Sequence, residues 1–204
     1  MSDTKAHWDN LYATMESAEP GWAQSVANKS LALIRSLDLP KNVSIIDIGG
    51  GDSLLADALL EEGYTDVAVL DISAEALEKA KKRLGEKAEK VRWLNCDLTN
   101  FRPARPYHLW HDRATFHFFT TPGQIAQYIN IASYAIPPGG YMIMGTFSDN
   151  GGTESHGLPV KQYTEETLSY TLASYFTKVG CQIESQPAPD RTVQDFLFCR
   201  FRRL

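Results

Sequence analysis

Residues 43–53 decide the fold of this chain, and they read Val43-Ser44-Ile45-Ile46-Asp47-Ile48-Gly49-Gly50-Gly51-Asp52-Ser53. The first six are mostly apolar and β-branched, which is typical of a strand buried on both faces of a sheet. Three glycines follow, and glycine allows positive φ and leaves bare backbone against which a ligand can lie. Apolar residues then recur at helical spacing from Leu54 to Leu59. The stretch predicts a strand, a tight turn and a helix.

The rest of the chain continues the alternation of short β-rich runs with longer helical stretches. Such alternation favours parallel βαβ units over a sandwich or a bundle. We predict an α/β fold, a doubly wound and mostly parallel seven-stranded sheet with helices on both faces. Besides the first strand, the predicted strands are residues 67–70, 91–94, 107–110, 141–147, 181–185 and 196–201.

The composition excludes several classes of protein. The chain has 204 residues and a net charge of −5, so it lacks the broad basic surface that grips nucleic acid. Its odd number of widely spaced cysteines, Cys96, Cys181 and Cys199, predicts neither a disulfide framework nor a metal site. The polar N-terminus predicts no signal peptide, and no run approaches the roughly 18 apolar residues of a membrane helix. We expect a cytoplasmic protein with no membrane partner.

Acidic residues stand at the ends of three consecutive predicted strands, at Asp47, Asp71 and Asp97. Because the carboxyl ends of parallel strands meet at one edge of a sheet, we expect these side chains to lie together. An acid at position 71 can accept hydrogen bonds from both hydroxyls of a ribose, and one at position 97 can accept from an adenine amino group. Each acid can equally cap a helix or a turn, and the glycines alone are compatible with a turn that binds nothing.

The glycine turn departs from the dinucleotide-binding pattern G-x-G-x-x-G. Gly49 and Gly51 match the pattern, but Leu54 stands at its third glycine. Asp52 places a negative charge where a pyrophosphate would sit, at the N-terminus of a helix. A cofactor that carries a sulfonium and an ammonium group is not repelled there. A nicotinamide-dependent oxidoreductase is therefore only a minor alternative.

The run Asp47-x-Gly49-x-Gly51-x-Ser53 resembles the first motif of the class I S-adenosylmethionine-dependent methyltransferases. Residues 137–140 resemble the turn before the fifth strand of that family. The resemblance covers residues 42–147 well and implies a seven-stranded sheet with the last strand antiparallel. It also implies S-adenosyl-L-methionine as the cofactor and methyl transfer as the activity. Many members have glycine in place of Ser53. A non-catalytic S-adenosylmethionine-binding or adaptor module of the same fold is the alternative.

The same resemblance assigns cofactor contacts. Gly49 and Gly51 lie against the amino-acid part of the cofactor, Asp71 binds the ribose, and residues after Asp71 and at Asp97 contact the adenine. The N-terminal run resembles a "W-x-x-x-Y" opening that folds over the cofactor, although two aromatics at this spacing can also dock on a core. Residues 1–204 are thus predicted to be one domain, with a helical lid over 1–40 and a core over 41–204. The implied cofactor-binding residues are Asp47, Gly49, Gly50, Gly51, Asp71, Ile72, Asp97, Leu98, Trp8 and Tyr12.

Residues 111–119, HDRATFHFF, follow the predicted fourth strand, where this family commonly places residues next to the transferred methyl. Asp112, His111 and His117 are the candidate catalytic residues, since each can polarise or deprotonate a nucleophile. The alternatives are structural: Asp112 pairs with its neighbour Arg113 or caps a turn, and His117 is a packed core histidine. A base is needed only if the nucleophile arrives protonated.

The sequence leaves the methyl acceptor open. A small amine or thiol and a protein lysine each fit a pocket lined by aromatic side chains. The loop over 148–163 either covers the substrate or is a surface excursion. Nucleic acid is disfavoured because no Asn-Pro-Pro-Tyr type motif follows the fourth strand, and the sequence does not indicate an oligomeric state. The predicted lining residues are Phe116, Phe118, Phe119 and Tyr163.

Overall fold

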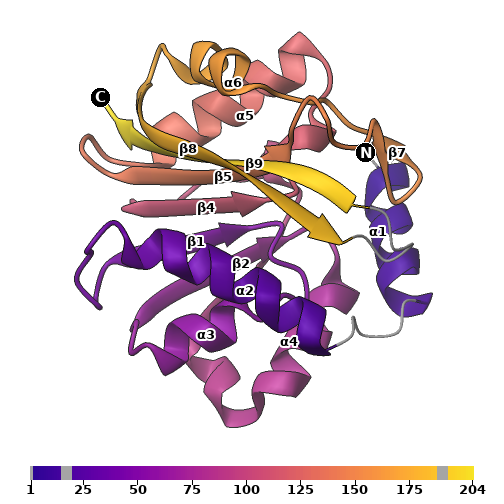
Figure 1. The fold of residues 1–204 in the computed structure, drawn as a ribbon. Helices are drawn as coiled ribbons and strands as arrows, with labels where there is room; N and C mark the ends of the chain where they lie inside the picture. The colour runs from indigo at the N-terminus through magenta and orange to yellow at the C-terminus, as the bar shows by residue number, and fades with distance from the viewer. Residues whose placement is uncertain (1, 15–19, 188–192) are drawn as a thin grey trace. The chain divides into compact units, whose positions relative to one another are not determined.

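The computed structural model describes residues 2–14, 20–187 and 193–204 (Figure 1). The chain forms two compact units, Met1–Phe101 and Arg102–Leu204. Seven strands make the main sheet, in the order β3-β2-β1-β4-β5-β9-β8. This confirms the predicted α/β fold with a mostly parallel seven-stranded sheet. The predicted single domain with its helical lid stays a prediction.

The first unit is built on three parallel strands. β1 pairs with β2 and β2 pairs with β3, all in parallel, so their carboxyl ends share one edge. Every residue of β1 is buried, as its apolar sequence predicts. The helices α2 and α3 lie side by side in this unit (Figure 1). The elements are α1 Ser2–Thr14, α2 Pro20–Arg35, β1 Ser44–Ile48, α3 Leu55–Glu61, β2 Asp66–Asp71, α4 Ala74–Leu84, η1 Gly85–Lys90, β3 Val91–Asn95 and η2 Leu98–Asn100.

The second unit combines parallel and antiparallel pairing. β4 runs parallel to β5, whereas β9 is antiparallel to both β5 and β8, as expected for the last strand. Helices α5 and α6 lie over the same side of these strands (Figure 1). Both helices begin with a capping box, which starts at Thr121 in α5 and at Thr164 in α6. The elements are β4 Leu109–Arg113, η3 Phe116–Phe118, α5 Pro122–Ala135, β5 Tyr141–Phe147, β6 Glu154–Ser155, β7 Leu158–Pro159, α6 Glu165–Leu172, β8 Phe176–Pro187 and β9 Val193–Arg203.

Three strands differ from their predicted bounds by more than one residue at an end. β8 and β9 are far longer than residues 181–185 and 196–201. β4 begins and ends later than predicted, so His111 and Asp112 lie inside the strand rather than after it. A buried strand rarely carries ionisable residues, because an unpaired buried charge is costly. For this reason the predicted strand stopped before His111.

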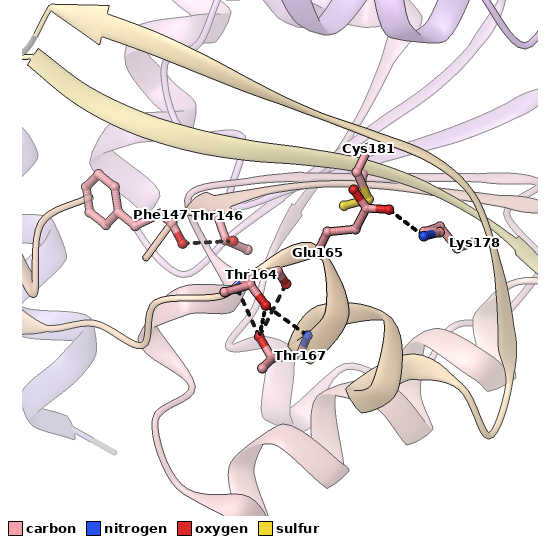
Figure 2. The surroundings of a disulfide bond; sticks show 8 residues. Thr146, Phe147, Thr164, Glu165, Thr167, Lys178 and Cys181 are labelled. Atoms are coloured by element: carbon pink, nitrogen blue, oxygen red, sulfur yellow. Dashed lines mark hydrogen bonds and ion pairs between the residues drawn. A yellow bond between two sulfur atoms is a disulfide. The ribbon is translucent and has the colours of Figure 1, made fainter. Parts of the chain in front are cut away.

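A disulfide joins β8 to β9, which corrects the expectation from the cysteine spacing. The antiparallel register places Cys181 opposite Cys199, with 4.1 Å between their Cα atoms. Figure 2 shows Cys181 and the disulfide bond. Figure 2 also shows α6 attached to β8 nearby through the Glu165–Lys178 ion pair. Strand pairing rather than sequence spacing brings the two sulfurs together, so the pattern alone could not predict the bond.

Removing this disulfide is expected to lower the free energy of unfolding by about 3 kcal/mol, the loop-closure entropy expected for a closed loop of this length. Cys181 and Cys199 are 18 residues apart. The measurement is denaturant unfolding of the double variant Cys181→Ser/Cys199→Ser. The matched control is Cys96→Ser, which replaces a cysteine outside the disulfide. If both variants lost the same amount of unfolding free energy, the disulfide would not be stabilising.

Among the described residues, no helix has both the length and the apolar character needed to cross a bilayer.

Candidate functional site

The glycine turn has the backbone geometry that the sequence predicts. Gly49 and Gly51 hold φ of +63° and +52°, which side-chain-bearing residues rarely adopt. The N–H groups of Gly49 and Gly50 donate to the carbonyl of Leu70 on β2, at 2.7 and 3.3 Å. A Cβ on Gly50 would lie 2.7 Å from both Oδ2 of Asp47 and Cγ1 of Val69, so a larger residue there would require these side chains to shift. The turn is fixed against β2 before any ligand arrives.

Asp71 at the end of β2 fastens this turn. Its Oδ2 accepts a hydrogen bond from the N–H of Gly51 at 2.8 Å, and its Oδ1 accepts from the N–H of Ser73 at 2.8 Å. The side chain is buried, and hydrogen bonds to a carboxylate are stronger than neutral ones. Asp71 therefore sets the position of the third glycine, a role that the sequence analysis did not foresee.

The edge at which Asp71 lies is strongly acidic. Burial raises the pKa of Asp71 to about 6, and the charges of Asp47 and Asp52 raise it further against the hydrogen bonds from Ser73 and Gly51. Asp47, inside β1, is also buried. Such an edge repels phosphate and attracts a cation.

The residues predicted to contact adenine lie where the strands of the first unit end. Asp97 caps η2, since its Oδ1 accepts from the N–H and from the hydroxyl of Thr99, both at 2.8 Å. Leu98 is buried and Ile72 is half-buried. Asn95 Nδ2 donates to the Ile72 carbonyl at 3.0 Å, which joins the ends of β2 and β3. The acids 47, 71 and 97 thus meet at one edge, as predicted, and Asp97 also caps a turn.

Helix α1 brings an aromatic pair to the glycine turn. The rings of Trp8 and Tyr12 lie 6.4 Å apart on one face of the helix. A Cβ on Gly51 would lie 2.5 Å from the hydroxyl oxygen of Tyr12, so any side chain at position 51 would collide with it. Within the first unit, Tyr12, Gly51 and Asp71 therefore form one cluster.

Asp9 attaches α1 to the N-terminus of α4, and the sequence analysis did not single it out. Its Oδ1 accepts from the Ser73 hydroxyl at 2.8 Å and from the N–H of Ala74 at 3.1 Å, at the N-terminus of α4. A carboxylate is favourable there because it satisfies donors that the helix leaves free. The separation of 64 positions between Asp9 and Ser73 explains why no local pattern revealed the pair.

In the second unit, Asp112 is the centre of a buried hydrogen-bond network. Its Oδ2 accepts from the hydroxyl of Tyr128 at 2.5 Å, and Tyr128 in turn accepts from Nε1 of Trp110 at 2.9 Å. Its Oδ1 accepts from the N–H groups of Thr115 and Phe116 at 3.1 and 3.2 Å. The carboxylate thereby shapes the chain between β4 and η3.

These contacts favour a positioning role for Asp112. Burial raises its pKa to about 6, while the hydrogen bonds from Tyr128, Phe116 and Thr115 oppose the rise. Both oxygens are engaged within the fold, so the side chain is poorly placed to take a proton from a substrate. His111 is also buried, and the alternation of a strand places it on the opposite face of β4.

His117 in η3 is the candidate whose nitrogens the fold leaves unused. Its ring stacks on Phe147 with centroids 4.9 Å apart and planes at 4°. Among the described residues, neither ring nitrogen has a hydrogen-bond partner. Burial, together with the charges of Arg113 and His156, lowers its pKa to about 3, so the imidazole is neutral at pH 7. It combines features of both sequence alternatives, since it packs among aromatic rings and presents unpaired nitrogens.

Comparisons with known proteins agree with this arrangement. Residues 45–140 match a family model described as a methyltransferase domain. This region contains the glycine turn, the acids at 71 and 97, and residues 111–119. No curated protein matches the sequence.

Three solved structures illustrate the similarity in fold. A structure concerned with conversion of a disulfide bond into a thioacetal group during echinomycin biosynthesis has a TM-score of 0.76 at 18% identity, covering 100% of this chain and 93% of that one. The Burkholderia thailandensis 1,6-didemethyltoxoflavin-N1-methyltransferase, with 1,6-didemethyltoxoflavin and S-adenosylhomocysteine bound, scores 0.73 at 20%, covering 99% and 88%. The N-methyltransferase NodS from Bradyrhizobium japonicum WM9, with S-adenosyl-L-homocysteine, scores 0.66 at 19%, covering 92% and 89%.

Proposed function

We propose that this chain is a class I S-adenosylmethionine-dependent methyltransferase that transfers a methyl group to a small-molecule nucleophile. The cluster of Tyr12, Gly51 and Asp71 is the observation that carries the proposal. It combines bare backbone, a buried carboxylate and an aromatic hydroxyl at the carboxyl end of β1 and β2. Ligands of open α/β sheets bind at such strand ends.

The residues of the first unit fit this cofactor. The acids at 47, 52 and 71 attract its sulfonium and ammonium groups, whereas a pyrophosphate would be repelled. Each oxygen of Asp71 accepts one hydrogen bond in the turn and has a second lone pair with which it would accept from the ribose hydroxyls. Ile72 would pack on the adenine. Oδ1 of Asp97 already accepts hydrogen bonds from Thr99. Oδ2 of Asp97 would therefore accept the hydrogen bond from the adenine amino group. Trp8 and Tyr12 would cover the cofactor from α1.

When bound, the cofactor supplies a methyl group already activated on sulfur, so the protein mainly has to orient the reactants. Asp112 shapes the chain from Arg113 to Phe116 through its hydrogen bonds to Thr115, Phe116 and Tyr128. The neutral imidazole of His117 can accept a hydrogen bond from the acceptor and hold it in one orientation.

The choice of a small-molecule acceptor is supported by one relative in fold, the 1,6-didemethyltoxoflavin-N1-methyltransferase, whose structure has 1,6-didemethyltoxoflavin bound. The acidic balance of the sequence agrees, because it offers no basic surface for nucleic acid. We also propose a cytoplasmic location. Cell fractionation tests that location: the protein is expected in the cytoplasmic fraction, and recovery outside it would contradict the proposal.

Calorimetric titration tests cofactor binding directly. The native protein is titrated with S-adenosylmethionine and, separately, with reduced nicotinamide cofactor. We expect heat and a rise in melting temperature with the first and neither with the second. A folded sample that gives no response at millimolar S-adenosylmethionine would overturn the proposal.

Cofactor affinity is expected to depend on pH through Asp71. Its pKa is about 6, so the carboxylate is ionised above pH 7 and protonated at pH 5. A cationic ligand binds the ionised form better, so the dissociation constant should be constant above pH 7 and rise up to about tenfold per unit below pH 6. Calorimetry between pH 5 and 8 measures this. A flat profile in a folded protein would show that Asp71 does not bind the cofactor.

A further inference from the structure

We propose that His117 and Tyr163 are the polar contacts of an acceptor-binding site in the second unit, and that this site takes a flat aromatic small molecule with a ring N–H or O–H. The inference rests on the proposed methyltransferase function and narrows its acceptor to one chemical class. It differs from the aromatic pocket expected from the sequence because it assigns the hydrogen-bonding atoms.

The first observation concerns buried polar atoms. Within the described part of the chain, Nδ1 and Nε2 of His117 and the hydroxyl of Tyr163 have no hydrogen-bond partner. The exposed fractions of the two residues are 0% and 1%. An unsatisfied polar atom in the interior costs about 1–3 kcal/mol, and nearly all such atoms in folded proteins are paired. A core histidine and a core tyrosine normally find partners, so these two call for a functional reason.

The second observation is that both residues pack against aromatic rings. These rings form two groups, His117 with Phe147 and Phe196, and Phe116 with Tyr163, and we call the five residues together the aromatic box. Besides the stack of His117 on Phe147, the ring of Tyr163 stacks on Phe116 with centroids 5.4 Å apart, and Phe196 lies 4.7 Å from Phe147. Aromatic rings bind other flat rings by stacking and by edge-to-face contact. The box therefore suits a planar ligand better than an alkyl chain.

The box joins η3 to the segment that follows β5. The N–H of Lys161 donates to the His117 carbonyl at 2.8 Å, and the N–H of Tyr163 donates to the Phe147 carbonyl at 3.0 Å. These two hydrogen bonds attach the end of the 148–163 loop to two residues of the aromatic box, His117 and Phe147. Long loops beside ligand sites are often functional, because they can open and close. Entry of a ligand would require this loop to shift, since the polar atoms are buried.

The charges beside the box define the ligand further. The charged groups that act on His117 are Arg113 and His156, and both are basic. Arg113 lies 5.6 Å from the Phe196 ring and the ammonium of Lys161 lies 5.3 Å from the Tyr163 ring. Basic groups repel an ammonium, so an alkylamine or a lysine side chain is disfavoured. A neutral or anionic aromatic compound is favoured.

Ligand-observed NMR with defined probes tests this proposal. The aromatic probes are 4-hydroxybenzoate, indole-3-carboxylate and quinolin-4-ol, at millimolar concentration. The non-aromatic control is trans-4-hydroxycyclohexanecarboxylate, which keeps the charge and the hydroxyl of the first probe but is not flat. We expect at least one aromatic probe to bind and the control to bind at least about tenfold more weakly. If no aromatic probe binds, or if the control binds equally well, the proposal is wrong.

Single substitutions test whether the aromatic probe binds at His117 and Tyr163. His117→Phe and Tyr163→Phe keep the flat rings but remove the polar atoms. Each should raise the dissociation constant of the bound probe about tenfold. The matched controls are His108→Phe and Tyr170→Phe, at two exposed positions, and should bind normally. Tyr163→Phe should also raise the melting temperature by about 2–4 °C, since an unsatisfied hydroxyl is lost. Unchanged probe binding, or a lower melting temperature in Tyr163→Phe, would overturn the proposal.

Titration of the same samples with S-adenosylhomocysteine separates the two proposals. Binding of S-adenosylhomocysteine without any aromatic probe would reject the aromatic box and leave the methyltransferase function intact. Probe binding without S-adenosylhomocysteine would reject that function while supporting the box.

Discussion

Replacing Asp71 with asparagine is expected to raise the dissociation constant for S-adenosylmethionine about 100-fold, which corresponds to about 2.7 kcal/mol. Two losses add up. Asparagine has one acceptor oxygen, so it cannot accept from the N–H groups of both Gly51 and Ser73, and the turn loses one of its two fastenings. It also removes the negative charge and the second acceptor that the cofactor's ribose and sulfonium would meet. Isothermal calorimetry at pH 8 measures the change.

Asp66→Asn is the matched control for this variant. Asp66 stands at the opposite end of the same strand, and its carboxylate lies 3.8 Å from Arg92 at the surface. Exposed ion pairs of this kind contribute little to stability, so the variant should fold normally and its cofactor binding should be unchanged. The binding site would have to be placed elsewhere if both variants lost the same affinity, or if Asp71→Asn bound S-adenosylmethionine normally.

Replacing Asp112 with alanine is expected to lower the free energy of unfolding by about 3 kcal/mol at pH 8. Three donors lose their acceptor, namely the N–H groups of Thr115 and Phe116 and the hydroxyl of Tyr128. Each unsatisfied donor costs about 1–3 kcal/mol, and relief from burying the carboxylate offsets part of the total. Denaturant unfolding of the variant beside native protein gives the value. A loss below about 0.5 kcal/mol would show that the network does not stabilise the fold.

Asp112→Asn separates positioning from proton transfer. Asparagine can accept from the two N–H groups and donate to Tyr128, so the network is largely kept. A carboxyl whose folded-state pKa of about 6 exceeds its unfolded value is stabilising while protonated, and this stability is lost as the pH rises from about 4 through 6. The asparagine variant should lack that pH dependence. The methylation rate of the Asp112→Asn variant should fall less than about tenfold. Loss of a general base would instead lower that rate about 100-fold or more.

The sequence was most informative where backbone and chemistry demand the same residues. The glycine turn was predicted correctly because Gly49 and Gly51 need positive φ directly after a buried strand. The acids at 47, 71 and 97 were expected at one edge because parallel strands end together, and the structure places them there. These inferences depend on local spacing and on one rule of sheet topology, so they needed no tertiary information.

Long-range contacts could not be predicted in the same way. Asp9 reaches Ser73 across 64 residues, and Cys181 meets Cys199 only because β8 and β9 pair in one register. Asp112 was expected beyond the end of β4 because a buried carboxylate is unusual in a strand. Its partner Tyr128 lies on α5, which no pattern linked to that position. Such pairs depend on the packing of separate elements.

Transfer of labelled methyl groups tests the central claim most directly. The native protein is incubated with methyl-labelled S-adenosylmethionine and cell extract separated by size, with Asp71→Asn as the control. We predict that the label enters the small-molecule fraction, and that it does so far less with the control. Label found only in macromolecules would contradict the small-molecule acceptor, and no transfer to either fraction by a protein that binds the cofactor would contradict the enzymatic function.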